Sequence, residues 1–278
     1  IEALVARVRE KIQDGARTAE ALAPEIAALD ALAAKYKDQK TDEVAQIAFL
    51  KASLYPQVIE DTDTAKKILL QLKTDFPGTE IAGAVDETLA AIERDAKARE
   101  AQAAVIGKPA PELHFKWASR DGVKKLSDLK GKVVVLDFWA TWCGPCVASF
   151  PEIAAMTTRY KDSDVVVIGV TSLQGAIIGL EAKPISTEGE PEKEFSLMRD
   201  YIKAKNINWT IAFSEEEVFN PDYGIRGIPH MAIIAPDGTV RHNAIHPAEP
   251  GKEEKIDALL KEFQLKVPEA PAATPAAG

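Results

Sequence analysis

The sequence is poor in cysteine: its 278 residues contain only two, Cys143 and Cys146. One chain can therefore form no disulfide other than the one between them, and this usage fits either a reducing or an oxidising compartment. No second cysteine pair is present, and the four histidines are scattered rather than spaced as ligands, so half of a zinc site is the weaker interpretation. We expect neither a metal nor an organic cofactor.

Long apolar runs and basic runs are also missing. No stretch approaches the roughly 20 apolar residues needed to span a membrane. A net charge of -9 argues against a nucleic-acid surface. The chain begins at Ile1 rather than Met, which indicates processing or trimming, so a signal peptide or membrane anchor removed with the preceding segment would not be visible.

Residues 1–104 differ in composition from the rest of the chain. They are rich in Ala, Leu, Glu and Lys, and breaks fall at 14–15, 38–42, Pro56 and 76–79. Apolar residues recur at helical spacing within 4–8, 22–32, 44–54, 65–72 and 81–92. This pattern predicts about five helices in a separate bundle. Residues 45–92 look like a degenerate tetratricopeptide-type repeat, but no clean period recurs, and a simple bundle packing on its neighbour is the alternative.

Residues 105–265 alternate between strand and helix patterns, after an expected linker at 102–111 that contains Gly107, Pro109 and Pro111. We expect, in order, an opening hairpin at 113–123, a helical turn at 126–131, buried strands at 133–136 and 165–170, an inserted polar loop at 173–194, a helix at 195–205, a strand at 209–213, a hairpin of 231–235 and 240–244, and a helix at 252–263. This order predicts a mixed sheet covered on both faces. The Pro/Ala-rich residues 266–278 are predicted to be disordered.

The two cysteines lie where the strand that starts at Val133 meets a helix at 147–156, which Pro151 should bend. The first sulfur would then lie at a helix N-terminus, where unpaired N–H groups and a partial positive charge favour thiolate over thiol. Gly144 and Pro145 allow a sharp turn, and proline in the first helical turn loses no hydrogen bond. The spacing therefore indicates a redox site.

Two separated stretches, 137–146 (Asp-Phe-Trp-Ala-Thr-Trp-Cys-Gly-Pro-Cys) and 220–229 (Asn-Pro-Asp-Tyr-Gly-Ile-Arg-Gly-Ile-Pro), resemble thioredoxin. The order of elements in 106–265, with the entry 107–113 and an added segment between Val170 and Trp209, is similar to the TlpA/ResA branch of that superfamily. The resemblance implies an α/β thioredoxin fold, with helices flanking a mixed central sheet, preceded by the separate all-α bundle. It also implies an extracytoplasmic thiol-disulfide oxidoreductase, periplasmic or membrane-tethered.

Cys143, before the helix, is expected to be the exposed nucleophile, and Cys146, one turn in, the buried resolving thiol. Asp137 is an acid in an otherwise apolar strand. A structural acid would need a buried hydrogen-bond partner, whereas the resemblance implies a base for Cys146 with a pKa raised by desolvation. Thioredoxin often carries a lysine on the next strand, and residues 165–170 contain none.

Pro229 matches the cis-proline that thioredoxins place opposite the cysteines; a trans proline opening a strand is the alternative. The resemblance implies that the backbone of Ile228 pairs with an extended substrate segment. His230 stands where thioredoxin has threonine, and is either an ordinary strand residue or an imidazole that biases the Cys143 thiolate.

Trp142, Gly144 and Pro145 are expected to border the substrate, Trp142 as part of the rim that partner proteins touch. Trp139 and Trp142 could instead be core residues only. The interpretation that follows is dithiol–disulfide exchange with protein substrates and an upstream electron-donor protein, without nucleic acid. The Gly-Pro dipeptide between the cysteines matches the reducing thioredoxins, whose reduction potential is roughly -270 mV, against roughly -120 mV for strong oxidants. The dipeptide therefore favours a reductase of apocytochromes or other extracytoplasmic disulfides.

Two other classes of protein compete with this interpretation. In the first, the helical domain is the principal part of a docking or assembly protein and the redox module is auxiliary. In the second, the chain is a peroxidase of the peroxiredoxin type, which shares a similar entry sequence. That class needs a lone peroxidatic cysteine after proline and threonine or serine, and the sequence from Trp142 to Cys146 does not supply it.

Overall fold

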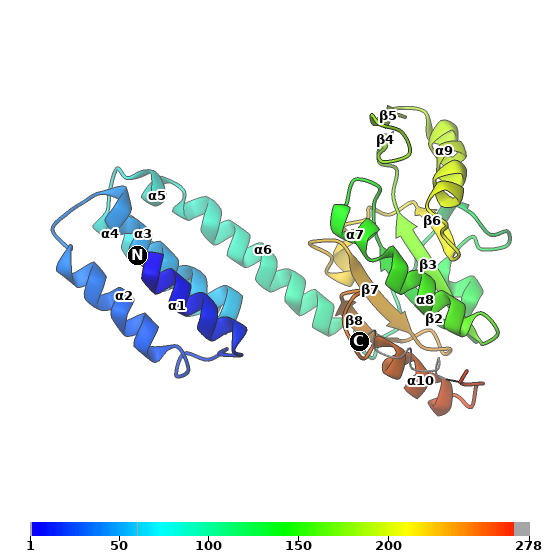
Figure 1. Cartoon of the computed structure of the whole chain (residues 1–278), viewed down its shortest axis with the longest axis horizontal. Helices are drawn as coiled ribbons and strands as arrows, with labels where there is room; N and C mark the ends of the chain where they lie inside the picture. Colours follow the sequence, from blue (N-terminus) through cyan, green and yellow to red (C-terminus); the bar gives the residue numbers. More distant parts are fainter. Residues whose placement is uncertain (1, 60, 270–278) are drawn as a thin grey trace, which may run out of the picture. The chain divides into compact units, whose positions relative to one another are not determined.

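A computed structural model describes residues 2–59 and 61–269 (Figure 1). The chain divides into two compact units, one ending at Lys97 and one beginning at Ala98. Helix α6 (Val85–Ala104) runs through this boundary without interruption, so Gln102 is helical where a linker was predicted.

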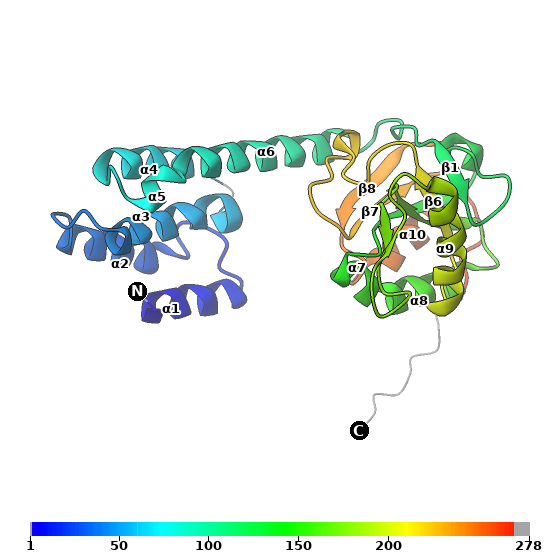
Figure 2. The same cartoon turned by 90° about the horizontal axis from the view of Figure 1, so that it is seen from above.

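Six α-helices precede the first strand in the described residues. They are α1 (Glu2–Gln13), α2 (Ala23–Lys35), α3 (Asp42–Leu54), α4 (Thr62–Asp75), α5 (Glu80–Gly83) and α6. In Figure 2, α3 lies between α1 and α4. The breaks predicted at 14–15, 38–42 and 76–79 separate helices. Pro56 does not end its segment, because the chain continues as a π-helical turn (Tyr55–Ile59). A short helix α5, capped by Thr79, precedes α6 where one helix was expected.

The second unit is built on a six-stranded sheet in the order β1-β6-β3-β2-β7-β8. The strands are β1 (Phe115–Ala118), β2 (Val133–Phe138), β3 (Val165–Thr171), β6 (Thr210–Ser214), β7 (His230–Ile234) and β8 (Val240–Ile245). Strand β3 runs parallel to β2 and β6, and the other pairs are antiparallel. The mixed sheet of the thioredoxin fold is therefore confirmed.

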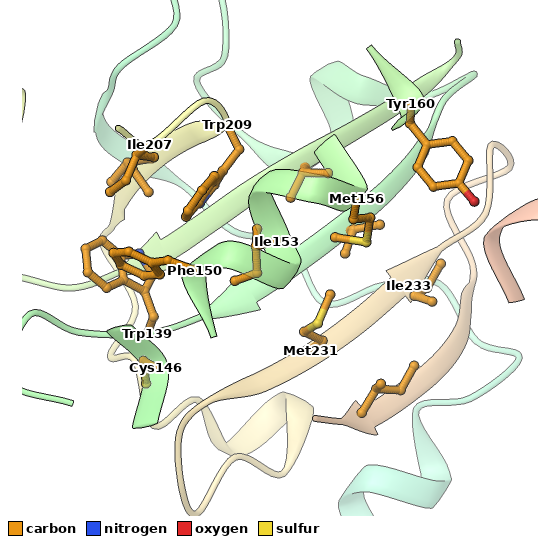
Figure 3. Packing of buried hydrophobic residues seen from close by; sticks show 14 of the residues in the cluster. Trp139, Cys146, Phe150, Ile153, Met156, Tyr160, Ile207, Trp209, Met231 and Ile233 are labelled. Atoms are coloured by element: carbon orange, nitrogen blue, oxygen red, sulfur yellow. The ribbon is translucent and has the colours of Figure 1, made fainter. Parts of the chain in front are cut away.

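Alternation along the central strand sends successive side chains to opposite faces of the sheet. Val133, Val135 and Trp139 pack with helices α8 (Phe150–Tyr160), α9 (Pro191–Ala204) and α10 (Lys252–Glu262), as Figure 3 shows for part of this cluster. The other face carries Leu136 and Phe138 and is covered by the 3-10 turns η2 (Leu126–Leu129) and η3 (Pro221–Tyr223) and by neighbouring loops. All of β2 is buried, as its unbroken apolar run predicts.

The predicted opening hairpin forms only in part. Across its turn, the Phe115 N–H donates to the Lys124 carbonyl and the Leu126 N–H donates to the Leu113 carbonyl, on either side of a bridge between His114 and Lys125. Strand β1 itself pairs antiparallel with β6, about a hundred residues further on. Phe115 lies in the core beneath the sheet, which a free-standing hairpin could not provide. The added segment after β3 contains two short paired strands, β4 (Ala176–Ile177) and β5 (Ile185–Ser186).

The helix predicted after the cysteines is divided into α7 (Gly144–Ala148) and α8, with Ser149 between them. Pro151 lies in the first turn of α8, where its missing N–H removes no hydrogen bond. No helix in the described ranges has both the length and the apolar character to cross a membrane. Of the predicted disordered tail, residues 266–269 have no regular structure, and 270–278 lie outside the described residues.

Candidate active site

The two cysteines form a disulfide at the start of α7, with their Cα atoms 5.3 Å apart. Cys143 is the N-cap residue, and the backbone N–H of Cys146 donates to its Sγ at 3.2 Å. Cys143 retains 5% of its accessible surface and Cys146 retains 1%. Cys143 is the more exposed of the two cysteines, as the sequence analysis predicts. It is nevertheless less exposed than expected, because its sulfur packs against the Ile228 carbonyl oxygen, 3.6 Å away.

Asp137 lies on β2 between Val135 and Trp139, two residues of the cluster that also contains both cysteines. The strand's alternation places its side chain on that same face. Asp137 is buried, and burial alone raises the pKa of its carboxyl group to about 7. Within the described residues its Oδ1 atom has no hydrogen-bond partner. The group would therefore change protonation near neutral pH, in the layer that holds the sulfurs.

The residue paired with Asp137 on the neighbouring strand β3 is Gly169. A Cβ atom there would lie 2.7 Å from Ile211 Cδ1 and 2.9 and 3.0 Å from the indole nitrogens of Trp139 and Trp209. Those indole N–H groups are buried and lack partners among the described residues. The position opposite the acid is thus filled by two tryptophans, and it requires glycine.

The Ile228–Pro229 peptide bond is cis, as the resemblance to thioredoxin implies. The next residue, His230, pairs with Phe138, so its side chain lies on the opposite face of the sheet from Asp137. The ring of His230 contacts Phe138 edge-on at 5.9 Å, and its Nε2 lies 2.8 Å from Asn243 Oδ1. Burial lowers the pKa of His230 and favours the neutral ring. These contacts orient His230 away from Cys143 and into the far core.

Trp142 is 46% exposed, and Gly144 and Pro145 beside it are also exposed, whereas Trp139 is wholly buried. Of the two tryptophans in the motif, one therefore belongs to the core and the other to the rim. The ring of Trp142 lies 6.2 Å from that of Phe219, a residue that the sequence analysis did not select.

Buried Glu194 was also missed by sequence reasoning. It accepts hydrogen bonds from the backbone N–H groups of Gln174 and Gly175 and from the Thr187 hydroxyl. The acidic start of α9 gave no sign that this carboxylate turns inward. In residues 2–59 and 61–269, no group of three or more His, Cys, Asp or Glu side chains is arranged to hold a metal ion.

Most of the second unit is similar in sequence to known proteins. Residues 106–260 match the family model Redoxin. Over 159 residues the chain is 28% identical to the thiol-disulfide oxidoreductase ResA of Bacillus thuringiensis, covering 57% of this chain and 78% of the relative. Over 157 residues it is 30% identical to the ResA of Bacillus cereus, covering 56% and 78%. A solved thioredoxin domain of a thiol-disulfide oxidoreductase from Bacteroides vulgatus is 19% identical, with a TM-score of 0.39 over 57% of this chain and 96% of that one.

The fold, the cysteine pair and these relatives define a thiol-disulfide oxidoreductase of the thioredoxin superfamily. The chain belongs to the redoxin family.

Proposed function

We propose that this enzyme reduces disulfides in extracytoplasmic proteins, with Cys143 as the attacking thiol and Cys146 as the resolving thiol. The observation that carries the proposal is the position of Cys143 Sγ at the N-cap of α7, where it accepts the Cys146 N–H. A backbone N–H directed at sulfur stabilises the thiolate, which is the reactive form in thiol–disulfide exchange.

The reaction proceeds in two exchanges. The Cys143 thiolate attacks one sulfur of the substrate disulfide, whose S–S bond breaks, and the other substrate sulfur leaves as a thiolate. The Cys146 thiol then loses its proton and attacks Cys143 Sγ, which closes the enzyme disulfide and releases the second substrate thiol. Two electrons pass from the cysteine pair to the substrate, and an upstream electron-donor protein restores the dithiol.

Asp137 is the proposed base for Cys146. A general base works best when its pKa lies near the operating pH, and burial brings this carboxyl group to about 7. The side chain lies on the sulfur-bearing face, and its Oδ1 has no other partner among the described residues. A carboxylate held this way is available to take the proton that resolution releases.

Substrate binding is assigned to the segment before β7 and to the exposed turn around the cysteines. The Ile228 carbonyl oxygen lies 3.6 Å from Cys143 Sγ, so a segment paired to the backbone there would have its own sulfur within reach. Pro229, the next residue, is proposed to border the same segment. Trp142, Gly144 and Pro145, next to Cys143 in the sequence, are exposed and are proposed to border the same segment. His230 would support the loop from the far face.

The direction and the location are inferred from the motif and from the relatives. Gly144 and Pro145 separate the cysteines as in reducing thioredoxins. The resemblance to the TlpA/ResA branch, with which the relatives named ResA agree, supports a periplasmic or membrane-tethered enzyme. Residues 1–104 are proposed to dock a partner protein.

The reduction potential of the cysteine pair tests the direction. The protein is equilibrated with dithiothreitol and glutathione buffers, and the dithiol fraction is quantified by thiol trapping and mass spectrometry. A reductase should give roughly -270 mV and reduce insulin with dithiothreitol as donor. A value near roughly -120 mV would assign the opposite direction.

A further inference from the structure

Large apolar side chains that remain exposed are few in the described residues: Leu70, Ile106, Trp142, Leu173, Ile178 and Phe219. Single exposed apolar residues need no explanation, but a cluster of them marks a surface for interaction. The last four come from three separate segments of the second unit, and three contacts bring these segments together beside the cysteines.

Three contacts join the segments. The rings of Trp142 and Phe219 lie 6.2 Å apart. Next to Phe219, the backbone N–H of Val218 donates to Ser172 Oγ at 3.3 Å, which fixes the chain beside Leu173. The backbone N–H of Ile178 donates at 3.2 Å to the hydroxyl of Thr141, the residue before Trp142.

The added segment after β3 is also fixed by hydrogen bonds to the side chains of Thr141 and Glu194. Gln174 Oε1 accepts both the backbone N–H and the hydroxyl of Thr141, at 2.9 and 2.7 Å. Glu194, 1% exposed, accepts from the backbone N–H groups of Gln174 and Gly175 at 2.7 and 3.1 Å and from the Thr187 hydroxyl at 2.6 Å. These hydrogen bonds compensate the desolvation of the Glu194 side chain and hold the segment in one conformation.

We propose that Leu173, Ile178 and Phe219 form, with Trp142, an apolar wall that selects extended protein segments with large apolar side chains next to the reacting cysteine. This inference rests on the proposed function. The occupant must deliver a sulfur atom to Cys143 and align its backbone at Ile228, which a polypeptide segment does and a small disulfide does not. The side chains that flank its cysteine would then lie on the wall and bury apolar surface.

The test compares two synthetic peptides, each bearing one cysteine as a mixed disulfide with thionitrobenzoate, flanked by Leu and Phe in one and by Ser and Gly in the other. With the reduced, full-length protein in excess, the rate of thionitrobenzoate release gives the second-order rate constant for a single turnover. We expect about a tenfold or greater preference for the apolar peptide, and we expect Leu173→Ser with Ile178→Ser to remove most of it. Leu70→Ser and Ile106→Ser are matched controls and should retain the preference.

Equal rates for the two peptides, or a preference that survives the double substitution, would contradict the proposal that the apolar wall selects the substrate. The symmetric small disulfide of thionitrobenzoate separates this failure from failure of the proposed function. Every variant should reduce it at the wild-type rate, whereas a wild-type protein unable to reduce it would contradict the exchange chemistry itself.

A second, independent set of contacts joins the end of α6 to the loop that leads to β7. Gly224 has φ +68°, and a Cβ atom on it would lie 2.5 Å from the Ala98 carbonyl oxygen and 2.8 Å from Gln102 atoms. The Gln102 side chain donates to the Gly224 carbonyl at 2.9 Å. Helix and loop are therefore in direct contact at Gly224.

Asn243 extends this link to the start of β7. Its Nδ2 donates to the carbonyl oxygens of Tyr223 and Gln102, at 3.0 and 3.3 Å. Because both acceptors are carbonyls, the amide orientation is fixed and Oδ1 faces His230 Nε2 at 2.8 Å. His230 must then carry its proton on Nε2, so one asparagine ties α6, the loop and the residue after Pro229 together.

We infer that Gln102 and Asn243 are positioning residues for the Ile228–Pro229 segment. Gln102→Ala and Asn243→Ala should each raise KM for a protein disulfide several-fold and leave reduction of the small thionitrobenzoate disulfide unchanged. In Asn243→Ala, the ¹⁵N spectrum of His230 should lose the pure Nε2–H tautomer. Gln71→Ala and Asn208→Ala, which also remove side-chain hydrogen bonds, are the controls. An unchanged KM in both test variants, or equal losses with both disulfides, would contradict the inference.

Discussion

Asp137 on β2 pairs with Gly169 on β3, so the residue opposite the buried acid has no side chain that could neutralise it. Thioredoxin often places a lysine on this strand, whereas here the indole rings of Trp139 and Trp209 lie against the glycine. Burial without a cation is the reason that the pKa of Asp137 rises to about 7. The pKa of Asp137 is thus set by exclusion of water rather than by a charged partner.

This burial predicts a pH-dependent stability difference between the wild type and Asp137→Asn. Because the pKa is raised in the folded state, the protonated acid costs no stability at low pH, and stability is lost as the pH rises through about 7. The loss is spread between the unfolded pKa of about 4 and the folded value, at about 1.4 kcal/mol for each pKa unit, so the asparagine variant should gain a few kcal/mol over the wild type at pH 9 and little at about pH 4. Urea unfolding at both pH values measures this, and an equal difference at both would contradict it.

The same substitution should slow the resolution step. Asparagine occupies the same space but cannot take the Cys146 proton, and general bases contribute about 10²-fold or more. Release of substrate from a preformed mixed disulfide, followed by rapid quench, isolates this step. The wild-type rate should rise as the pH passes about 7. Insulin reduction by the variant at the wild-type rate across neutral pH would limit Asp137 to a structural role.

Gly169→Ala should destabilise the enzyme by about 1–3 kcal/mol. The added methyl group would meet Ile211 and two indole nitrogens at 3.0 Å or less, and overpacking of this kind forces side chains out of their rotamers. Thermal or urea unfolding measures the loss. Gly83→Ala is the matched control, since no atom lies within 4 Å of its added carbon, and its stability should not fall. A Gly169 variant as stable as the control would show that the tryptophans can move.

Cys143 should be alkylated faster than Cys146 in the reduced protein. Its sulfur accepts a backbone N–H at the N-cap and retains more accessible surface. Brief iodoacetamide treatment of the reduced protein, followed by peptide mass spectrometry, measures both rates. Preferential labelling of Cys146 would reverse their assignment.

The sequence was sufficient wherever local pattern decides structure. The buried run of β2, the helical periods before residue 104 and the cysteines between strand and helix each depend on neighbouring residues, and the structure agrees. Pairing of β1 with β6 was missed because it joins residues about a hundred positions apart, and turn signals near Gly122 favoured a local hairpin.

Two features of the site could not be predicted from the sequence, because they also depend on contacts between residues far apart in the chain. Whether His230 faces the cysteines depends on its register with Phe138, and its partner Asn243 lies on another strand. Gly169 reads as an ordinary strand glycine until Trp139 and Trp209 are brought against it. In each case the decisive contact is made by residues distant in sequence.

The central claim is that Cys143 attacks and Cys146 resolves. It is tested most directly by trapping the mixed disulfide with a disulfide-bonded protein substrate such as insulin. Reduced Cys146→Ser should accumulate a covalent complex with the substrate that dithiothreitol reduces. Peptide mapping should show that its intermolecular disulfide is formed by Cys143. Reduced Cys143→Ser should accumulate little. A complex that forms through Cys146 in the second variant, and not in the first, would contradict the assignment.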